Sequence, residues 1–337
     1  MGEKVVICVP NWLGDSIMSM PAVQRYRILY PENRITVLVK EALAGLWRMQ
    51  SAADDVISFQ PSLTGTFSAA GRIRAGGFDQ AYVFPNSFRS ALMPFAAGVP
   101  RRTGARGHWR SNMLTNIVRT GRNGYRPHQA WEYCDILGVS GEMRDPGVPE
   151  LSLPAGAEET RRRMREETGP VPWAAIMPGA ARGPSKRWPA GRFAETGRQL
   201  VKRKGCMVLV FGTDEDRAAC REVARGAGGK ARDLSGKTSL EDAAALLGDC
   251  VLAVTNDSGG MHLAAAAGTS VAAVFGTTDP DRTGPLGRGH RIVSVPGAPK
   301  SRDIKPGSVS GRRYLEAIAP EAVTKAAIEV FENNMKK

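Results

Sequence analysis

The chain has 337 residues, a net charge of +13 and 42% hydrophobic residues, a composition typical of a folded globular protein. It is longer than a single core usually allows, so we expect two domains. No apolar run approaches the roughly 20 residues of a membrane-spanning helix, and the first residues do not form a signal peptide, so we expect a cytoplasmic protein.

The first half of the chain alternates strand-like and helix-like segments. Lys4–Val9 is a predicted strand, followed by a loop and a helix that ends near Tyr30. Pro21 predicts that this helix becomes regular only near that residue, or is kinked there. The next predicted elements are Ile35–Val39, Glu41–Met49, Val56–Phe59 and Ala81–Phe84. This alternation is typical of βαβ units and a parallel sheet.

The pattern begins again after a charged helix, Glu158–Glu167, and a linker-like segment, Gly169–Pro172. Four strands are predicted in this half, at Trp173–Met177, Met207–Phe211, Val251–Thr255 and Val271–Phe275. The predicted helices are Arg192–Lys204, Glu215–Arg225, Leu240–Leu247, Met261–Ala267 and Pro320–Met335. We therefore expect an α/β protein with two doubly wound, Rossmann-like domains, at residues 1–160 and 170–320, and a C-terminal helix at 320–337.

Polar and glycine-rich segments follow the predicted strands, where ligands bind in parallel α/β sheets. They are Pro10–Asp15 and Pro85–Ser87 in the first half, and Pro178–Trp188, Gly212–Asp214 and Asn256–Gly260 in the second. Two such clusters facing each other across a domain cleft predict two substrates.

The Asn256–Gly260 segment joins a strand to a helix. Asp257 or Ser258 can cap that helix, and the glycines allow a ligand to approach the backbone. The free N–H groups at the start of the helix favour an anion. Since Asp257 itself repels phosphate, we expect it to bind a sugar hydroxyl or to hold the loop. His262 is more typical of a structural histidine than of a metal ligand.

The loop from Pro178 to Pro189 contains three cationic residues and no acid. Arg182 and Lys186 could neutralise a departing diphosphate, although a basic surface loop would look the same. The nearby Asn256 loop favours phosphate binding. Gly236-Lys237-Thr238 is not a Walker motif, because the first glycine of that motif is replaced by Ala231, and no G-x-G-x-x-G follows the first strand.

The segment from Gly71 to Arg126 is strongly basic. It has one acid, Asp79, and a net charge of +9 from arginines 72, 74, 89, 101, 102, 106, 110, 119, 122 and 126. This indicates either a solvated basic face or an anionic partner: nucleic acid, an acidic membrane surface or a phosphorylated substrate. Nucleic-acid binding has no support beyond charge, because zinc spacing, helix-turn-helix signatures and interleaved aromatic residues are absent. The five cysteines form no C-x-x-C pair and are predicted to be buried free thiols.

Asp15 follows the first strand. As a carboxylate at a strand end it could deprotonate an acceptor hydroxyl. The residue pattern alone favours a helix N-cap.

Three segments together resemble glycosyltransferase family nine, the bacterial heptosyltransferases. Val254–Gly268 looks like the hallmark segment of that family, "PGAARGPSKRWP" resembles its second segment, and "VPNWLGDSIMSMPAVQ" its N-terminal one. Phe78–Gly104 is most similar to the heptosyltransferase II branch. The matches follow in order along nearly the whole chain. Many relatives in this branch carry several cysteines in the segment corresponding to Gly297–Tyr314, and this chain has none there.

The resemblance implies a GT-B fold and an inverting transfer of heptose from ADP-heptose without metal or cofactor. It implies that Asp15 is the general base and that Lys186 contacts the donor diphosphate. The donor site then includes Arg182, Ser185, Asp214, Thr238, Ser239, Asp257, Ser258, Gly259 and His262. The lipid-linked, anionic acceptor is expected at Asn11, Asn86, Ser87, Arg89, Arg101 and Arg102.

The implied reaction adds heptose to the heptosyl-Kdo inner core of lipopolysaccharide. The enzyme would work at the cytoplasmic face of the inner membrane as a peripheral protein, where the basic segment could contact the anionic bilayer. Another family-nine transferase, such as heptosyltransferase I, remains an alternative, as does a sugar-nucleotide epimerase. A nucleic-acid-binding protein is a remote alternative.

Overall fold

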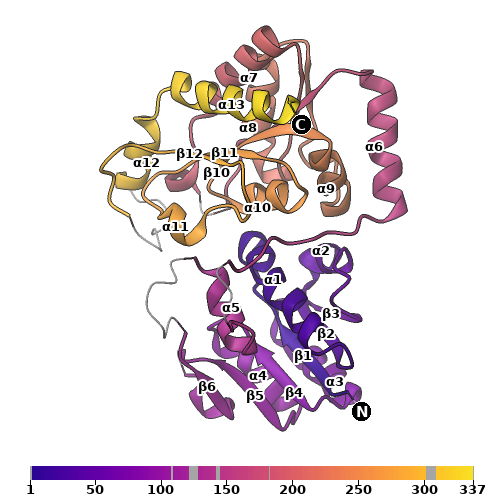
Figure 1. The fold of residues 1–337 in the computed structure, drawn as a ribbon. Helices are drawn as coiled ribbons and strands as arrows, with labels where there is room; N and C mark the ends of the chain where they lie inside the picture. Colours follow the sequence, from indigo (N-terminus) through magenta and orange to yellow (C-terminus); the bar gives the residue numbers. More distant parts are fainter. Residues whose placement is uncertain are drawn as a thin grey trace. The chain divides into compact units, whose positions relative to one another are not determined.

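The computed structural model describes residues 2–107, 109–120, 128–141, 145–181, 183–300 and 309–336. Arg182, a predicted donor-binding residue, lies outside these residues. The chain divides into two units, Met1–Ser152 and Leu153–Lys337, each built around its own six-stranded sheet (Figure 1). The predicted α/β class is confirmed.

The first unit is a parallel sheet between helices. Its strands are β1 (Lys4–Cys8), β2 (Arg34–Lys40), β3 (Asp55–Phe59), β4 (Gln80–Val83), β5 (Arg101–Ala105) and β6 (Asn116–Val118). Its helices are α1 (Leu13–Leu29), α2 (Ala44–Arg48), α3 (Leu63–Gly76), α4 (Phe88–Ala96) and α5 (Ala130–Leu137), with short 3-10 turns η1 (Glu41–Leu43) and η2 (Ser111–Met113). The strand order is β3-β2-β1-β4-β5-β6, and every described pairing is parallel.

Alternation along β1 divides its side chains between the two faces of the sheet. Val6 and Cys8 join the core that α3 and α4 cover, together with Ile73 and Met93. Helix α1 contacts α5, and α3 contacts α4. Burying a side chain of this kind stabilises the fold by about 1.5–3 kcal/mol.

Helix α1 begins at Leu13 and continues through Pro21, so the predicted late start near Pro21 is wrong. Proline cannot donate a hydrogen bond to the preceding turn, but the helix tolerates the loss because Pro21 and its neighbours Met20 and Ala22 are buried. Tertiary packing outweighs the local preference here.

The second unit repeats the same strand order. Its strands are β7 (Trp173–Met177), β8 (Met207–Val210), β9 (Ala231–Asp233), β10 (Cys250–Asn256), β11 (Val271–Val274) and β12 (Arg291–Val293). Its helices are α6 (Ala155–Thr168), α7 (Ala190–Lys204), α8 (Arg217–Ala227), α9 (Leu240–Gly248), α10 (Gly259–Ala266), α11 (Pro280–Thr283), α12 (Val309–Glu316) and α13 (Pro320–Met335), with 3-10 turns η3 (Pro184–Lys186) and η4 (Asp214–Asp216). Read in chain order, both sheets run 3-2-1-4-5-6, the doubly wound arrangement of Rossmann folds.

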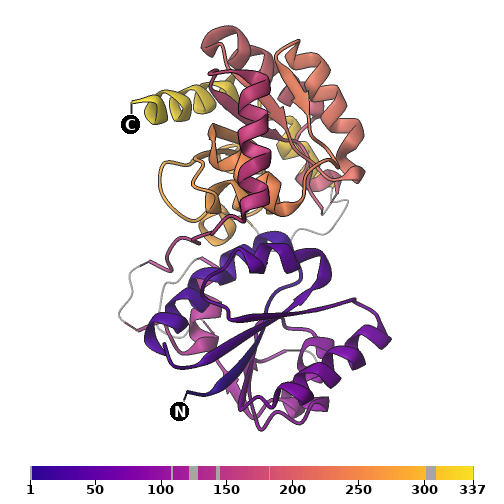
Figure 2. The same cartoon turned by 90° about the vertical axis from the view of Figure 1, so that its right-hand side faces the viewer.

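The C-terminal helix α13 is an integral part of the second unit. Val323, Ala327 and Phe331 belong to the same core as Ile176 of β7 and Val254 of β10. Asn334 donates a hydrogen bond to the carbonyl of Val251 at 2.8 Å. The residues expected as a separate terminal helix therefore complete one face of this sheet (Figure 2).

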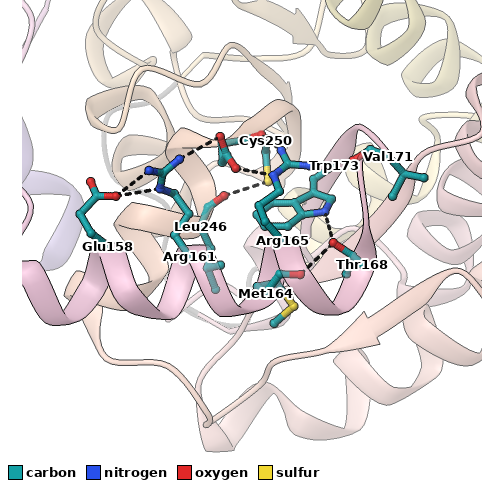
Figure 3. Close-up of polar contacts among 10 residues, drawn as sticks. Glu158, Arg161, Met164, Arg165, Thr168, Val171, Trp173, Leu246 and Cys250 are labelled. Carbon is teal, nitrogen blue, oxygen red and sulfur yellow. Dashed lines mark hydrogen bonds and ion pairs between the residues drawn. The ribbon is translucent and has the colours of Figure 1, made fainter.

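Helix α6 also belongs to the second unit, although the first domain was expected to extend to residue 160. Arg165 donates to the Asp249 carboxylate at 2.5 Å, and its guanidinium lies 3.6 Å from the centre of the Trp173 ring (Figure 3). Arg161 joins the same carboxylate to Glu158. These contacts tie α6 to the start of β7 and β10, so the second unit begins at Leu153.

All five cysteines are buried free thiols, as predicted. Burial raises the pKa of Cys8 and of Cys220 to about 12, so both thiols stay protonated at neutral pH. Separately, among the described residues no helix combines the length and the apolar character needed to cross a bilayer.

Candidate functional site

In each sheet, the order in which successive strands are added reverses at one point, the topological switch point. In the first unit this point lies between β1 and β4, and in the second between β7 and β10. Ligands of open α/β sheets bind beside such switch points, at the carboxyl ends of the strands. The segments Pro10–Asp15, Pro85–Ser87 and Pro178–Trp188 follow three of these strands, and Asn256–Gly260 begins at the last residue of the fourth, β10.

In the second unit, Lys186 and Asp257 form an ion pair across the switch point. The Lys186 Nζ lies 2.6 Å from Asp257 Oδ2, and the two side chains are only 12% and 7% exposed. A buried pair of this kind fixes the position of both groups, since either charge alone would be costly at this site. The expectation that Asp257 holds its loop agrees with this contact.

Asn256 fastens the lysine-bearing loop to β10. Its side-chain amide donates to the carbonyl of Pro178 at 2.7 Å, and its Oδ1 accepts from the backbone N–H of Trp188 at 2.9 Å. Asn256 is fully buried. It therefore holds both ends of the segment that contains Lys186. Trp188 is itself anchored, because its indole N–H donates to the Ile318 carbonyl at 3.1 Å.

Asp216 connects the same loop to the segment after β8. It accepts from Arg187 at 3.1 Å and from the N–H and hydroxyl of Thr213 at 3.2 and 3.0 Å. The segments after β8 and β9 are joined in turn by the hydrogen bond from Gly236 N to Gly212 O, 2.9 Å long. The loops after β7, β8, β9 and β10 thus form one connected rim at the carboxyl edge of the second sheet.

The start of α10 has features that suit an anionic ligand. Ser258 is its N-cap residue but makes no side-chain capping bond, so Asp257 and Ser258 do not cap this helix as predicted. A side chain at Gly260 would lie 2.9 Å from the Met177 sulfur, so this glycine allows α10 to pack closely on β7. The N–H groups of the first turn keep their capacity to bind an anion.

Two predicted donor residues close to this point are buried. The Ser185 hydroxyl has no hydrogen-bond partner among the described residues and is 1% exposed. Such a group costs about 1–3 kcal/mol unless a ligand or water completes it. His262 is also buried and has interactions within the fold.

The structure brings Asp214 together with the segment that carries Thr238 and Ser239. Gly236 adopts a φ of +67°, and a side chain there would meet the Asp214 carboxylate. Asp214 is exposed and forms an ion pair with Arg217. Ser239 caps α9 by accepting from the Asp242 N–H at 3.0 Å.

In the first unit, Asp15 lies in the first turn of α1. The N-cap residue is Trp12, so the predicted role of Asp15 as an N-cap is wrong. Its Oδ1 accepts from Gln129 Nε2 at 3.2 Å, and the same amide donates to the Tyr133 hydroxyl at 2.8 Å. Gln129 was not predicted, because a single glutamine 114 residues away in the sequence gives no signal of this contact.

Several predicted acceptor residues gather at the same edge of the first sheet. Asn11 follows β1 and is exposed, and Asn86 follows β4 and is exposed. Ser87 caps α4 by accepting from the Ser90 N–H at 3.3 Å. Arg89, in the first turn of α4, donates to the Pro61 carbonyl at 3.0 Å.

Arg110 is buried and is not part of a basic face. It donates to the Ala105 carbonyl through Nε at 3.0 Å, and to the carbonyls of Pro85 and Val83 through its two amino groups. Burial lowers its pKa to about 10. Arg110 thereby joins the carboxyl ends of β4 and β5. The preceding residue, Trp109, has a left-handed backbone (φ 56°), and its indole is exposed.

Arg101 and Arg102 lie at the opposite edge of the sheet from Asp15 and Asn86. They are the first residues of β5, and Arg101 pairs with Glu3, just before β1, at 2.7 Å. Arg102 donates to the Met113 carbonyl at 2.6 Å. The expected grouping of these two arginines with the other acceptor residues is therefore not found. The sequence did not reveal this because the segment was treated as one basic face.

The fold is shared with known proteins. The pattern of glycosyltransferase family 9 (heptosyltransferase) matches residues 66–311. Lipopolysaccharide heptosyltransferase 2 of Escherichia coli K12 is 32% identical over 309 residues, which cover 87% of this chain and 88% of that protein.

The chain belongs to glycosyltransferase family 9.

Two further relatives agree with this assignment. Lipooligosaccharide heptosyltransferase 2 of Haemophilus influenzae is 32% identical over 309 residues, with 87% and 88% of the two chains covered. The solved structure of E. coli ADP-heptose lipopolysaccharide heptosyltransferase II matches with a TM-score of 0.84 and 28% identity, over 98% of this chain and 99% of that one. The family-9 chain is thus a glycosyltransferase with the predicted GT-B fold.

The family-9 chain has no evident metal centre in the part that the structure describes. No group of three or more His, Cys, Asp or Glu residues there is arranged to hold a metal ion. Two cationic groups of its second-unit rim, Lys186 and Arg187, are engaged by carboxylates.

Proposed function

We propose that this family-9 enzyme transfers heptose from ADP-heptose to the heptosyl-Kdo inner core of lipopolysaccharide, with inversion at the anomeric carbon. The 32% identity to lipopolysaccharide heptosyltransferase 2 over most of both chains supports this substrate pair. Heptosyltransferase I activity and nucleic-acid binding have less support, since the curated relatives matched at 30% identity or more are named heptosyltransferase 2.

The donor half of the reaction is assigned to the second unit. Lys186 would contact the diphosphate, and the N–H groups at the start of α10 would bind the same charge as it develops. Asp257 keeps the lysine in place at 2.6 Å, and the buried Ser185 hydroxyl offers a further hydrogen bond to the ligand. Asp214, Thr238 and Ser239 are proposed to hold the adenosine, with Arg182, Ser258, Gly259 and His262 completing the donor set.

The acceptor half is assigned to the first unit. Asp15 would remove the proton of the attacking hydroxyl while the oxygen forms a bond to the anomeric carbon and the bond from that carbon to the diphosphate breaks. Gln129 fixes the orientation of the carboxylate. Asn11, Asn86, Ser87 and Arg89 are proposed to bind the sugar acceptor. Arg101 and Arg102 are not part of this set, because they lie at the start of β5, at the other edge of the sheet.

The observation that carries the proposal is the buried Lys186–Asp257 pair at the switch point of the donor unit. Mass spectrometry of a heptose-deficient core acceptor incubated with ADP-heptose tests the function directly. We expect one added heptose on an acceptor that already carries one, and little reaction on a core that ends in Kdo alone. Addition of heptose to the Kdo-only core instead would identify a heptosyltransferase I activity.

We propose that no metal ion or cofactor takes part, because Lys186 and a helix terminus can stabilise the leaving diphosphate. Transfer should then persist in excess EDTA. Loss of transfer that Mg²⁺ restores would contradict this. The proposed acceptor is anchored in the cytoplasmic face of the inner membrane, so we also propose that the enzyme is a cytoplasmic protein that binds this face peripherally.

A further inference from the structure

Helices α3 and α4 lie side by side and run in the same direction. Arg89, at the start of α4, donates to the Pro61 carbonyl just before α3, and Arg74, near the end of α3, donates to the carbonyl of Ala96 at the end of α4. Each helix buries a narrow face on the sheet, through residues such as Ile73 and Met93. The outer face of the pair is left to solvent.

Large apolar side chains occupy this outer face. Leu63 is 74% exposed and Phe67 62% exposed, and they are four residues apart on α3. Phe88 and Phe95 are 48% and 46% exposed and lie seven residues apart on α4. Residues at these spacings share one side of a helix. Single exposed apolar residues are ordinary, but four on two adjoining helices form a patch that marks a binding surface.

Arginines accompany these side chains, and acidic residues do not. Arg74 is exposed and lies on the same side of α3 as Leu63 and Phe67, and Arg102 places its guanidinium 5.4 Å from the centre of the Phe95 ring. No ion pair engages either of these two arginines among the described residues. The sequence from Gln60 to Phe78, which contains α3, and the sequence from Phe84 to Gly107, which contains α4, have no Asp or Glu. The charge of the patch is therefore uncompensated.

We infer that the outer face of α3 and α4, defined by Leu63, Phe67, Arg74, Phe88, Phe95 and the adjoining Arg102, docks on an anionic phospholipid bilayer. The inference rests on the proposed function, whose acceptor is lipid-linked. A bilayer uses both halves of the patch: apolar side chains enter the interface, and arginines meet the headgroup phosphates. A nucleic acid would use the arginines but would gain nothing from the exposed Leu63.

Cosedimentation with vesicles tests the surface without any sugar substrate. We expect the intact protein to bind vesicles of phosphatidylcholine mixed with phosphatidylglycerol, and to bind vesicles of phosphatidylcholine alone far more weakly. The Leu63→Ser/Phe67→Ser variant should bind anionic vesicles about 100-fold more weakly, roughly tenfold for each apolar side chain removed. Phe95→Ser should lose about tenfold by the same argument.

The arginines give a second, separable signal. Arg74→Ser should reduce binding to anionic vesicles by about fivefold, because it removes one positive charge from the face. Added salt should weaken the binding of the intact protein but have less effect on this variant. Ile28→Ser removes an equally exposed apolar residue from α1, and Arg221→Ser removes an exposed arginine from α8. Both controls should bind vesicles as the intact protein does.

Three results would overturn the inference: equal binding to neutral and anionic vesicles, unchanged binding of the Leu63→Ser/Phe67→Ser variant, or displacement of vesicles by an RNA oligonucleotide. Thermal unfolding and circular dichroism identify any variant that fails to fold, and Phe95→Ser then serves as the second test. Transfer to a deacylated, water-soluble acceptor should be normal in all these variants. Loss of this transfer in the variants would show that the face binds the acceptor sugars and not the bilayer. Absence of transfer in the intact protein would instead contradict the proposed function and leave the membrane inference untouched.

Discussion

Lys186 is proposed to bind the donor diphosphate, and it also neutralises the buried Asp257 carboxylate. Substitutions can separate these two roles. Lys186→Met should weaken ADP binding by about 1.5–3 kcal/mol, because the diphosphate loses a charge-assisted hydrogen bond. It should also lower the free energy of unfolding by roughly 3–5 kcal/mol, since the buried Asp257 carboxylate loses its partner. Adding Asp257→Asn should restore much of the stability but not the affinity. Calorimetry with ADP and thermal unfolding measure the two effects.

The control for this pair is Arg291, which pairs with Glu329 at the surface of the same unit. Arg291→Met should change neither property by much, because an exposed ion pair contributes little. If the double variant bound ADP as well as the intact protein, Lys186 would be a structural residue and not a ligand of the diphosphate.

Asp15 gives the second prediction for a single residue. Asp15→Asn keeps the shape of the side chain but cannot accept a proton, so transfer should fall by about 10²–10⁴-fold while ADP binding is unchanged. Asp55→Asn, a change to an exposed carboxylate at the start of β3, is the matched control. Near-normal turnover of the Asp15 variant in an assay for transferred heptose would show that Asp15 is not the general base and has only a structural role in the first turn of α1.

For single residues, the sequence predicted which residues belong to the candidate site better than it predicted which of them contact one another. It singled out Lys186 and Asp257 from two separate segments, but their direct contact spans 71 positions and leaves no local pattern. It counted Arg110 among the surface charges, because nothing nearby distinguishes a buried arginine from an exposed one. Burial of that guanidinium depends on three backbone carbonyls supplied by β4, β5 and the segment after β4.

Among the elements, the loop between β7 and α7 depends on Asn256 of β10. Asn256→Ala would leave the Pro178 carbonyl and the Trp188 N–H without their partners, at about 1–3 kcal/mol each. We expect ADP affinity to fall by at least about tenfold, or about 1.4 kcal/mol, because the loop that carries Lys186 is no longer held at both ends. Equilibrium binding of ADP and thermal unfolding together report the effect.

Asn334→Ala is the comparison variant. It also removes a side-chain amide bound to β10, but at the amino end of the strand, away from the ligand edge. It should lower stability and leave ADP affinity unchanged. Equal loss of affinity in both variants would indicate a general destabilisation and not a positioning role for Asn256.

The elements themselves were predicted where the sequence pattern is long and apolar. The expected strands Lys4–Val9, Trp173–Met177 and Val251–Thr255 correspond to β1, β7 and β10, the central strands of the two sheets. The three-residue strands β6, β9 and β12 were not predicted, because they lie at sheet edges and are partly exposed. A segment so short gains its conformation from a neighbouring strand and not from its own composition.

For the whole molecule, the division between Ser152 and Leu153 predicts that the second unit folds and binds ADP without the first. A fragment of residues 153–337 contains every proposed donor residue and its own complete core, including α6 and α13. We expect it to unfold cooperatively and to bind ADP with an affinity close to that of the full chain, but to transfer no heptose. The fragment 1–152 should not bind ADP. A folded 153–337 fragment without ADP affinity would show that the donor site needs the first unit.

The repeated strand order has a consequence for how such enzymes diversify. Both sheets of the chain have the same strand order. The switch point of the first lies beside Asp15, the proposed general base, and that of the second lies beside Lys186, the proposed diphosphate-binding residue. In the proposed assignment, substitutions in the loops after β1 and β4 would alter which sugar is accepted without changing the proposed nucleotide-binding residues. New acceptor specificity can therefore evolve through substitutions in the first unit alone. The second unit, and the sugar nucleotide that it is proposed to bind, would then stay the same.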